Sequence, residues 1–176
     1  MKLKSKVLST VALFALFTGT AQANPHNGFG LNAGLVNHSR DCVCLASTSS
    51  GLSLGLDYQF ALSNNLSISP FLMTSVESNS NVSGTAFSHG ILGVQLRFWA
   101  GGMFFGGHVG NYSEVLSNGT LSLSGSGGGA GLVAGWENPN GGLYVMGQAD
   151  SATVKYSGLS DIKISAVRLS VGYRWK

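Results

Sequence analysis

The chain has 176 residues; 44% are hydrophobic, only 10% are charged, and 26 are glycine. A soluble domain normally carries about a quarter charged residues, whereas a disordered chain has fewer apolar ones. Beyond the N-terminal segment no apolar run is long enough for a membrane helix. Low charge without such a helix is typical of a transmembrane β-barrel, in which lipid-facing and lumen-facing residues alternate.

The N-terminal segment has the pattern of a secretory signal peptide. Three lysines (Lys2, Lys4 and Lys6) precede the apolar run Val7–Phe17, and the small-residue sequence Ala21-Gln22-Ala23 follows. This order predicts export and cleavage after Ala23. We therefore expect a signal peptide over residues 1–23 and one domain over residues 24–176.

Cleavage would change the charge balance of the protein. The whole chain has ten Lys and Arg against seven Asp and Glu, and three of the lysines lie in the leader. The exported chain would then carry no formal net charge and no basic run. The basic balance of the full chain is therefore no indication of a nucleic-acid partner.

Alternation of apolar residues with small or polar ones occurs about eight times after the leader. The clearest segments are Leu52–Phe60 and the C-terminal Val167–Trp175. The other predicted strands are Gly28–Val36, Leu66–Val76, Ser88–Phe98, Gly102–Tyr112, Gly128–Glu137 and Leu143–Tyr156. Antiparallel strands in hydrocarbon must close on themselves, because an open edge leaves backbone groups unsatisfied. We expect an all-β, eight-stranded up-and-down transmembrane barrel with a lumen filled by side chains.

The connections between these strands alternate in length. Residues 61–65, 99–101 and 138–141 are short and turn-like, whereas 37–50, 77–87 and 113–127 are longer and rich in Ser, Asn and Gly. The last connection, near residues 158–160, is also short. Short turns on the periplasmic side and longer loops outside are typical of bacterial outer-membrane barrels.

Aromatic residues gather at the strand ends beside the short turns. Such a ring is expected where hydrocarbon meets water. The predicted periplasmic aromatic girdle consists of Tyr58, Phe60, Phe98, Trp99, Trp136, Tyr144, Tyr173 and Trp175.

Most of the charge falls on the predicted inner faces. A hairpin turning near residues 158–160 would place Asp150 directly opposite Arg168, as a structural ion pair. A gated or proton-conducting path is the alternative. The predicted lumen network consists of Asp57, Glu77, His89, Arg97, His108, Glu137, Asp150 and Arg168.

With its leader, the segment Leu52–Phe60 followed by Ser63-Asn64-Asn65-Leu66, and the closing Ser170-Val171-Gly172-Tyr173-Arg174-Trp175, the chain resembles the small OmpA-like, OmpX-like and opacity-protein-like outer-membrane barrels. The resemblance implies contact with outer-membrane lipid and lipopolysaccharide. It also implies recognition of the terminal strand by the barrel-assembly machinery, which typically meets a final aromatic residue; here Lys176 follows Trp175.

An enzyme is the second class of function considered. Lipid A deacylase barrels are similar in size and fold, and they place a His and a Ser two apart on one strand face. The two pairs here, His38 with Ser39 and Ser88 with His89, are adjacent, so each pair would point to opposite faces. We therefore predict no catalytic residues, no cofactor and no metal. A non-enzymatic role in envelope integrity or surface interaction is expected, with a lipid A hydrolase or a narrow small-solute channel as alternatives.

Cys42 and Cys44 lie in the first long connection. In an oxidising compartment we expect them to form a disulfide, although residues two apart in an extended chain are about 6.5–7 Å apart, at the limit of disulfide geometry. Free thiols, or a metal site shared with His38, are the alternatives.

Overall fold

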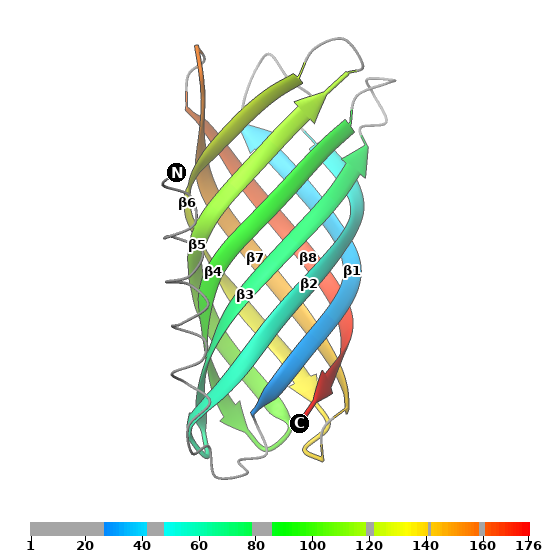
Figure 1. Ribbon diagram of the computed structural model, residues 1–176, viewed down its shortest axis with the longest axis vertical. Coiled ribbons are helices and arrows are strands. Elements are labelled where there is room, and N and C mark those ends of the chain that lie inside the picture. Colours follow the sequence, from blue (N-terminus) through cyan, green and yellow to red (C-terminus); the bar gives the residue numbers. More distant parts are fainter. Residues whose placement is uncertain (1–26, 42–47, 79–85, 119–121, 141, 159–160) are drawn as a thin grey trace, which may run out of the picture.

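The computed structural model describes residues 27–41, 48–78, 86–118, 122–140, 142–158 and 161–176. These residues form eight strands and no helix, as Figure 1 shows. The strands are β1 (Gly28–Asp41), β2 (Thr48–Ser63), β3 (Leu66–Ser78), β4 (Ala86–Ala100), β5 (Met103–Ser117), β6 (Ser122–Glu137), β7 (Gly142–Tyr156) and β8 (Ile162–Trp175).

Each strand pairs in antiparallel fashion with its neighbours in the chain, and the first strand pairs with the last. This closing pair, β1 with β8, runs from Phe29 opposite Trp175 to Asp41 opposite Lys163. No strand is therefore left with an open edge, so the ladder bonds can satisfy the backbone around the whole cylinder. The expected fold class, an eight-stranded antiparallel barrel, is confirmed.

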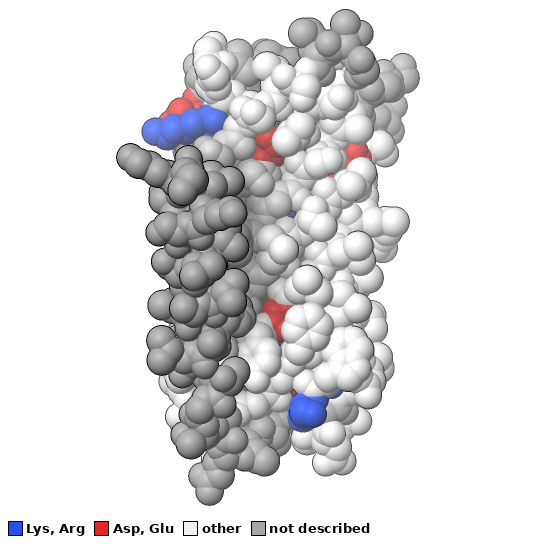
Figure 2. Space-filling model, in the orientation of Figure 1, with Lys and Arg blue, Asp and Glu red and all other residues white. Residues whose placement is uncertain are grey.

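Side chains alternate along the strands between an outer face that is mainly apolar and an inner face that holds the buried charged residues. On β8, Val167, Leu169 and Val171 are 65%, 61% and 50% exposed, whereas Arg168 and Ser170 between them are buried. The same order holds on β2 and β4. Figure 2 shows the result on one face, which is largely uncharged: its prominent Lys and Arg side chains lie near the two ends, and small charged patches are visible between them.

The strands extend further toward the longer connections than the sequence pattern predicts. β1 continues to Asp41, and β6 begins at Ser122, so residues 122–127, predicted to lie in a long connection, belong to a strand. Polar and glycine residues there do not alternate in hydropathy, and so the pattern carried no signal. Their backbone groups pair all the same, because ladder bonds need no particular side chain.

The predicted short turns are confirmed and lie together at the lower end of the barrel in Figure 1. Only residues 64–65 join β2 to β3, and only Gly101 and Gly102 join β4 to β5. Gly101 has a φ of +62°, a conformation that favours glycine.

Two members of the predicted aromatic girdle are placed wrongly by the sequence analysis. Trp99 is 4% exposed and Tyr144 is fully buried, and both point into the lumen. Trp99 follows Phe98 on β4, and adjacent strand residues face opposite sides, so only one of them can face outward. Phe29 and Phe105 do face outward and were not included. The other six predicted residues are on the outer face: Tyr58, Phe60, Phe98, Trp136, Tyr173 and Trp175.

Two predictions lie outside the described residues: the signal peptide, over residues 1–23, and the disulfide between Cys42 and Cys44. Within the part of the chain that the structure describes, no helix is long and apolar enough to cross a membrane.

Two glycines on neighbouring strands test the packing of the lumen. A Cβ atom on the inward-facing Gly172 would lie 2.3 Å from the Tyr144 ring and 2.6 Å from the Leu31 carbonyl oxygen. On Gly147 the nearest atom would be 3.9 Å away. We expect Gly172→Ala to lower the free energy of unfolding by about 1–3 kcal/mol and Gly147→Ala to leave it unchanged or raise it slightly. Urea unfolding followed by tryptophan fluorescence measures both, and equal effects would contradict the assigned facing.

Candidate functional site: the charged lumen

All eight residues of the predicted lumen network point inward and are at most 6% exposed. Four further buried residues of the charged or histidine kind join them in the described part of the chain, and the sequence analysis did not include these: His38, Arg40, Glu114 and Arg174. Three of the four lie in segments that were read as loops or as the end of a strand. Arg174 lies between the outward-facing Tyr173 and Trp175, so alternation alone could have placed it inside.

The cluster near the short turns is centred on Arg174. Its Nη2 atom lies 2.9 Å from Oδ2 of Asp57, and its Nε atom donates to Oε2 of Glu137 at 2.9 Å. Arg97 completes the cluster: its Nη1 donates to Gln59 at 2.7 Å, and its Nη2 lies 3.7 Å from Asp57. Two guanidinium groups thus balance two carboxylates.

Aromatic rings pack against these guanidinium groups, which explains why two aromatics turn inward. The Cζ atom of Arg97 lies 4.9 Å from the centre of the Phe104 ring, and that of Arg174 lies 5.3 Å from the centre of the Tyr144 ring. Guanidinium groups favour such positions over a ring face. Trp99 stacks obliquely on Phe104 and donates its indole N–H to Ser67 at 2.8 Å.

The middle of the lumen holds the predicted pair of Asp150 and Arg168. The pair forms through Arg168 Nη1 and Asp150 Oδ2, but the two residues are not directly opposite each other. Arg168 is opposite Gln148, and Asp150 is opposite Ala166. The register is therefore offset by two residues from the predicted one, and the pair still forms because the long arginine side chain reaches diagonally across the two strands. His108 also contacts Asp150, with its Nε2 2.8 Å from Oδ1.

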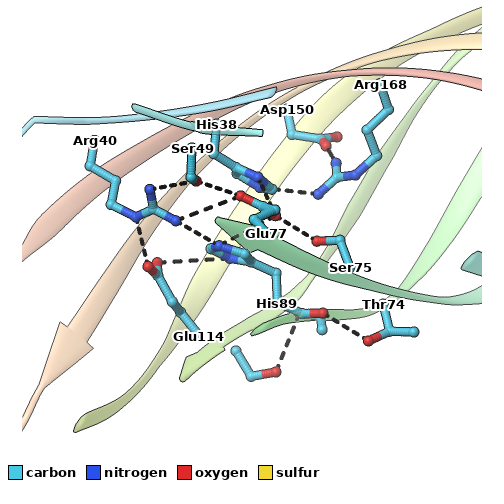
Figure 3. Close-up of polar contacts among 12 residues, drawn as sticks. His38, Arg40, Ser49, Thr74, Ser75, Glu77, His89, Glu114, Asp150 and Arg168 are labelled. Carbon is cyan, nitrogen blue, oxygen red and sulfur yellow. Dashed lines mark hydrogen bonds and ion pairs between the residues drawn. The ribbon is translucent and has the colours of Figure 1, made fainter. Parts of the chain in front are cut away.

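The cluster near the longer connections surrounds Glu77, as Figure 3 shows. His38 Nδ1 lies 2.7 Å from one carboxylate oxygen of Glu77, and the hydroxyl of Ser75 donates to the same oxygen at 2.7 Å. Ser49 donates to the other oxygen at 2.6 Å. His89 stacks on His38 with their ring centres 4.0 Å apart. Four strands thus contribute to one buried polar centre.

Arg40 connects this cluster to side chains on neighbouring strands of the barrel. Its Nε donates to Glu114 at 2.7 Å, its Nη1 donates to Ser49 at 2.9 Å, and its Nη2 lies 2.7 Å from Nε2 of His89. The Phe87 ring lies under its Cζ atom at 3.8 Å. The guanidinium therefore links β1 to β2, β4 and β5 through one planar group.

Side chains fill the space between these clusters. Phe71, Ile91, Val133 and Met146 point inward and are buried. A recess lined by Asn32, Asp57 and Phe71, among others, has a volume of about 10 Å³, which is room for about one water molecule.

Neither adjacent His–Ser pair can act as a hydrolase pair. His38 and His89 face the lumen, whereas Ser39 and Ser88 face outward, as the alternation predicts. Ser49, which pairs with His38 across β1 and β2, is buried and donates its hydroxyl to Glu77. A serine held in this way has no approach to a lipid acyl chain outside the barrel.

The sequence matches no protein-family model and no curated protein. Among solved structures, the chain is similar to Ail, the attachment invasion locus protein of Yersinia pestis, in its complex with the heparin analogue sucrose octasulfate. The TM-score is 0.61 at 15% identity, over 85% of this chain and 99% of that one. Neisserial surface protein A follows with a TM-score of 0.59 at 13% identity, over 84% of this chain and 97% of that one. The N-terminal barrel domain of Pseudomonas aeruginosa OprF gives 0.54 at 10% identity, over 85% and 99%. The chain thus has the fold of small eight-stranded outer-membrane barrels.

Removing Arg174 tests the cluster near the short turns. Arg174→Met would leave Asp57 and Glu137 as buried carboxylates with a single nearby arginine, so we expect a loss of about 3–5 kcal/mol in the free energy of unfolding. Adding Glu137→Gln to this variant removes the carboxylate that Arg174 alone among the arginines contacts, and should restore part of the loss. Denaturant unfolding of the two single variants and the double variant measures the coupling. Strictly additive effects would contradict the pairing.

Proposed function

We propose that the protein is a non-enzymatic outer-membrane barrel that is exported, spans the outer membrane and presents its longer connections to the outside. The observation that carries this proposal is the inverted polarity of the cylinder. Leu132, Leu52 and Leu92 are 71%, 68% and 65% exposed on the outer face, while nine charged side chains are buried inside: Arg40, Asp57, Glu77, Arg97, Glu114, Glu137, Asp150, Arg168 and Arg174. Water disfavours such an outer face and lipid favours it.

The orientation follows from the unequal ends. The short turns and the outward-facing aromatic residues lie at one end of the barrel, and the longer connections lie at the other. In bacterial barrels the short-turn end faces the periplasm, so that end is proposed to hold the interfacial girdle. The sequence of the N-terminal leader supports export through the inner membrane.

The role proposed for the barrel is surface interaction through the outer connections, or support of the envelope, rather than transport. Paired charges and apolar side chains fill the lumen, which argues against a conducting path. The inward direction of His38 and His89 argues against the lipid A hydrolase. The similar Ail structure holds a heparin analogue, which supports a surface-binding role for barrels of this fold.

Introducing a charged side chain on the outer face tests whether the barrel lies in a membrane. Leu132 lies near the middle of β6, whereas Leu62 lies beside a short turn and is 59% exposed. In lipid vesicles we expect Leu132→Arg to cost about 2–4 kcal/mol of folding free energy and Leu62→Arg about 0–1 kcal/mol. Urea titration of the two variants in vesicles measures the difference. Equal small costs would mean that hydrocarbon does not surround the barrel.

The location and the transport alternative need direct measurements. The full chain, expressed in a Gram-negative host, should be recovered in the outer-membrane fraction, and recovery as soluble periplasmic protein would overturn the proposal. In planar bilayers the purified protein should give little or no current. Steady conductance in the wild type, raised further in Arg168→Ala, would favour the small-solute channel instead.

A further inference from the structure

We propose that His38, Glu77 and His89 bind a divalent transition-metal ion such as Zn²⁺ inside the lumen. The three side chains come from β1, β3 and β4, and Figure 3 shows them around a common centre. Their ligand atoms all lie within 4.8 Å of one another, and all three residues are buried. The site goes beyond the proposed function, since it needs only the folded barrel and not its membrane location.

The distances are close to those of a metal-bound set. Ligands bound to zinc at about 2.0–2.2 Å in tetrahedral geometry lie about 3.4 Å from each other. Oε1 of Glu77 lies 2.7 Å from Nδ1 of His38 and 3.6 Å from Nε2 of His89. The two imidazole rings are stacked, with 11° between their planes, so one ring must turn out of the stack before both nitrogens face one ion. Strand residues hold all three groups, so the backbone need not move.

The charge of the lumen also favours a cation at this point. The buried set contains five carboxylates and four guanidinium groups. Asp150 pairs with Arg168, and Glu114 pairs with Arg40 at 2.7 Å. Glu77 shares that same arginine only at a distance: its Oε2 atom lies 3.8 Å from Nη2 of Arg40. Glu77 is therefore the carboxylate in excess, and a buried carboxylate without its own counter-charge is costly.

The chemistry of the donors selects the kind of metal. Two imidazoles and one carboxylate form a set that zinc occupies in proteins, with a fourth position left for water. Calcium and magnesium prefer sites made wholly of oxygen atoms. Glu114 Oε2 lies 3.8 Å from Nδ1 of His89, beyond hydrogen-bond distance; if the His89 ring shifts toward it on binding, it can orient that ring as carboxylates do beside metal-bound histidines.

Binding requires two arginine contacts to rearrange. Arg40 keeps Glu114 and Ser49 through its Nε and Nη1, and because its guanidinium is rigid the His89 ring must turn away from Nη2, which lies 2.7 Å from its Nε2. A metal on Nδ1 of His38 leaves the proton on Nε2, so Arg168, now 3.2 Å from that nitrogen, must turn toward Asp150. It already contacts Asp150. Both groups therefore keep a carboxylate partner.

Metal titration of the purified barrel in detergent tests the site. We expect equimolar binding of Zn²⁺ by calorimetry, and a Cu²⁺ electron paramagnetic resonance spectrum with two coupled nitrogens. His89→Gln should weaken Zn²⁺ binding at least about tenfold. The matched control His108→Gln removes a lumen histidine that contacts Asp150 instead and should leave binding unchanged. Cys42→Ser with Cys44→Ser should also leave it unchanged.

The outcomes that overturn the site are specific. Absence of equimolar binding by the wild type would overturn the site, and would mean that Arg40 is the cation that serves Glu77. Binding lost in the cysteine variant but kept in His89→Gln would place the metal elsewhere. If His89→Gln does not fold, two measurements on the wild type test the site: the two-nitrogen Cu²⁺ spectrum and a rise in the unfolding midpoint when Zn²⁺ is added. Absence of both would reject the site.

Discussion

The pairing of β1 with β8 is the constraint on which the rest of the structure depends. Thirteen residue pairs along this seam, from Phe29 with Trp175 to Asp41 with Lys163, turn a sheet into a cylinder. Closure removes every edge, so the backbone bonds internally without help from solvent. It also creates two surfaces of opposite character, because each strand must send alternate side chains inward and outward. The outer apolar face and the inner charged face are both consequences of that seam.

A narrow closed cylinder makes the inner face an unusual environment for charge. Four arginines and five carboxylates lie where little water can reach them, and each isolated charge would be strongly destabilising. The arginines reduce this cost because one planar group serves several acceptors on different strands. Arg174 spans Asp57 and Glu137, and Arg40 spans Glu114, Ser49 and His89. The ion pairs thus fix the packing of the lumen as well as its charge.

The two ends of the lumen differ in how completely their charges are paired, and we expect them to have different roles for this reason. At the short-turn end, Arg97 and Arg174 match Asp57 and Glu137 and pack on aromatic rings, which makes a closed structural plug. At the other end, Glu77 is held by serine hydroxyls and faces two stacked histidines. Imidazole groups can accept a metal or a proton where arginine cannot. Binding of a ligand inside the barrel is therefore expected at the end with the longer connections.

The sequence by itself determined the number of strands, the direction of most side chains and the positions of the short turns. Alternation such as Leu52–Phe60 or Val167–Trp175 encodes facing directly, since the side-chain period of a strand is two. Only the tertiary structure decided where the strands end in the polar segments. It therefore also decided that His38, Arg40 and Glu114 lie inside the barrel. It also decided which inward residues meet. Arg168 contacts Asp150 diagonally and His38 lies against Glu77, because strand register and barrel closure bring together residues that no local pattern links.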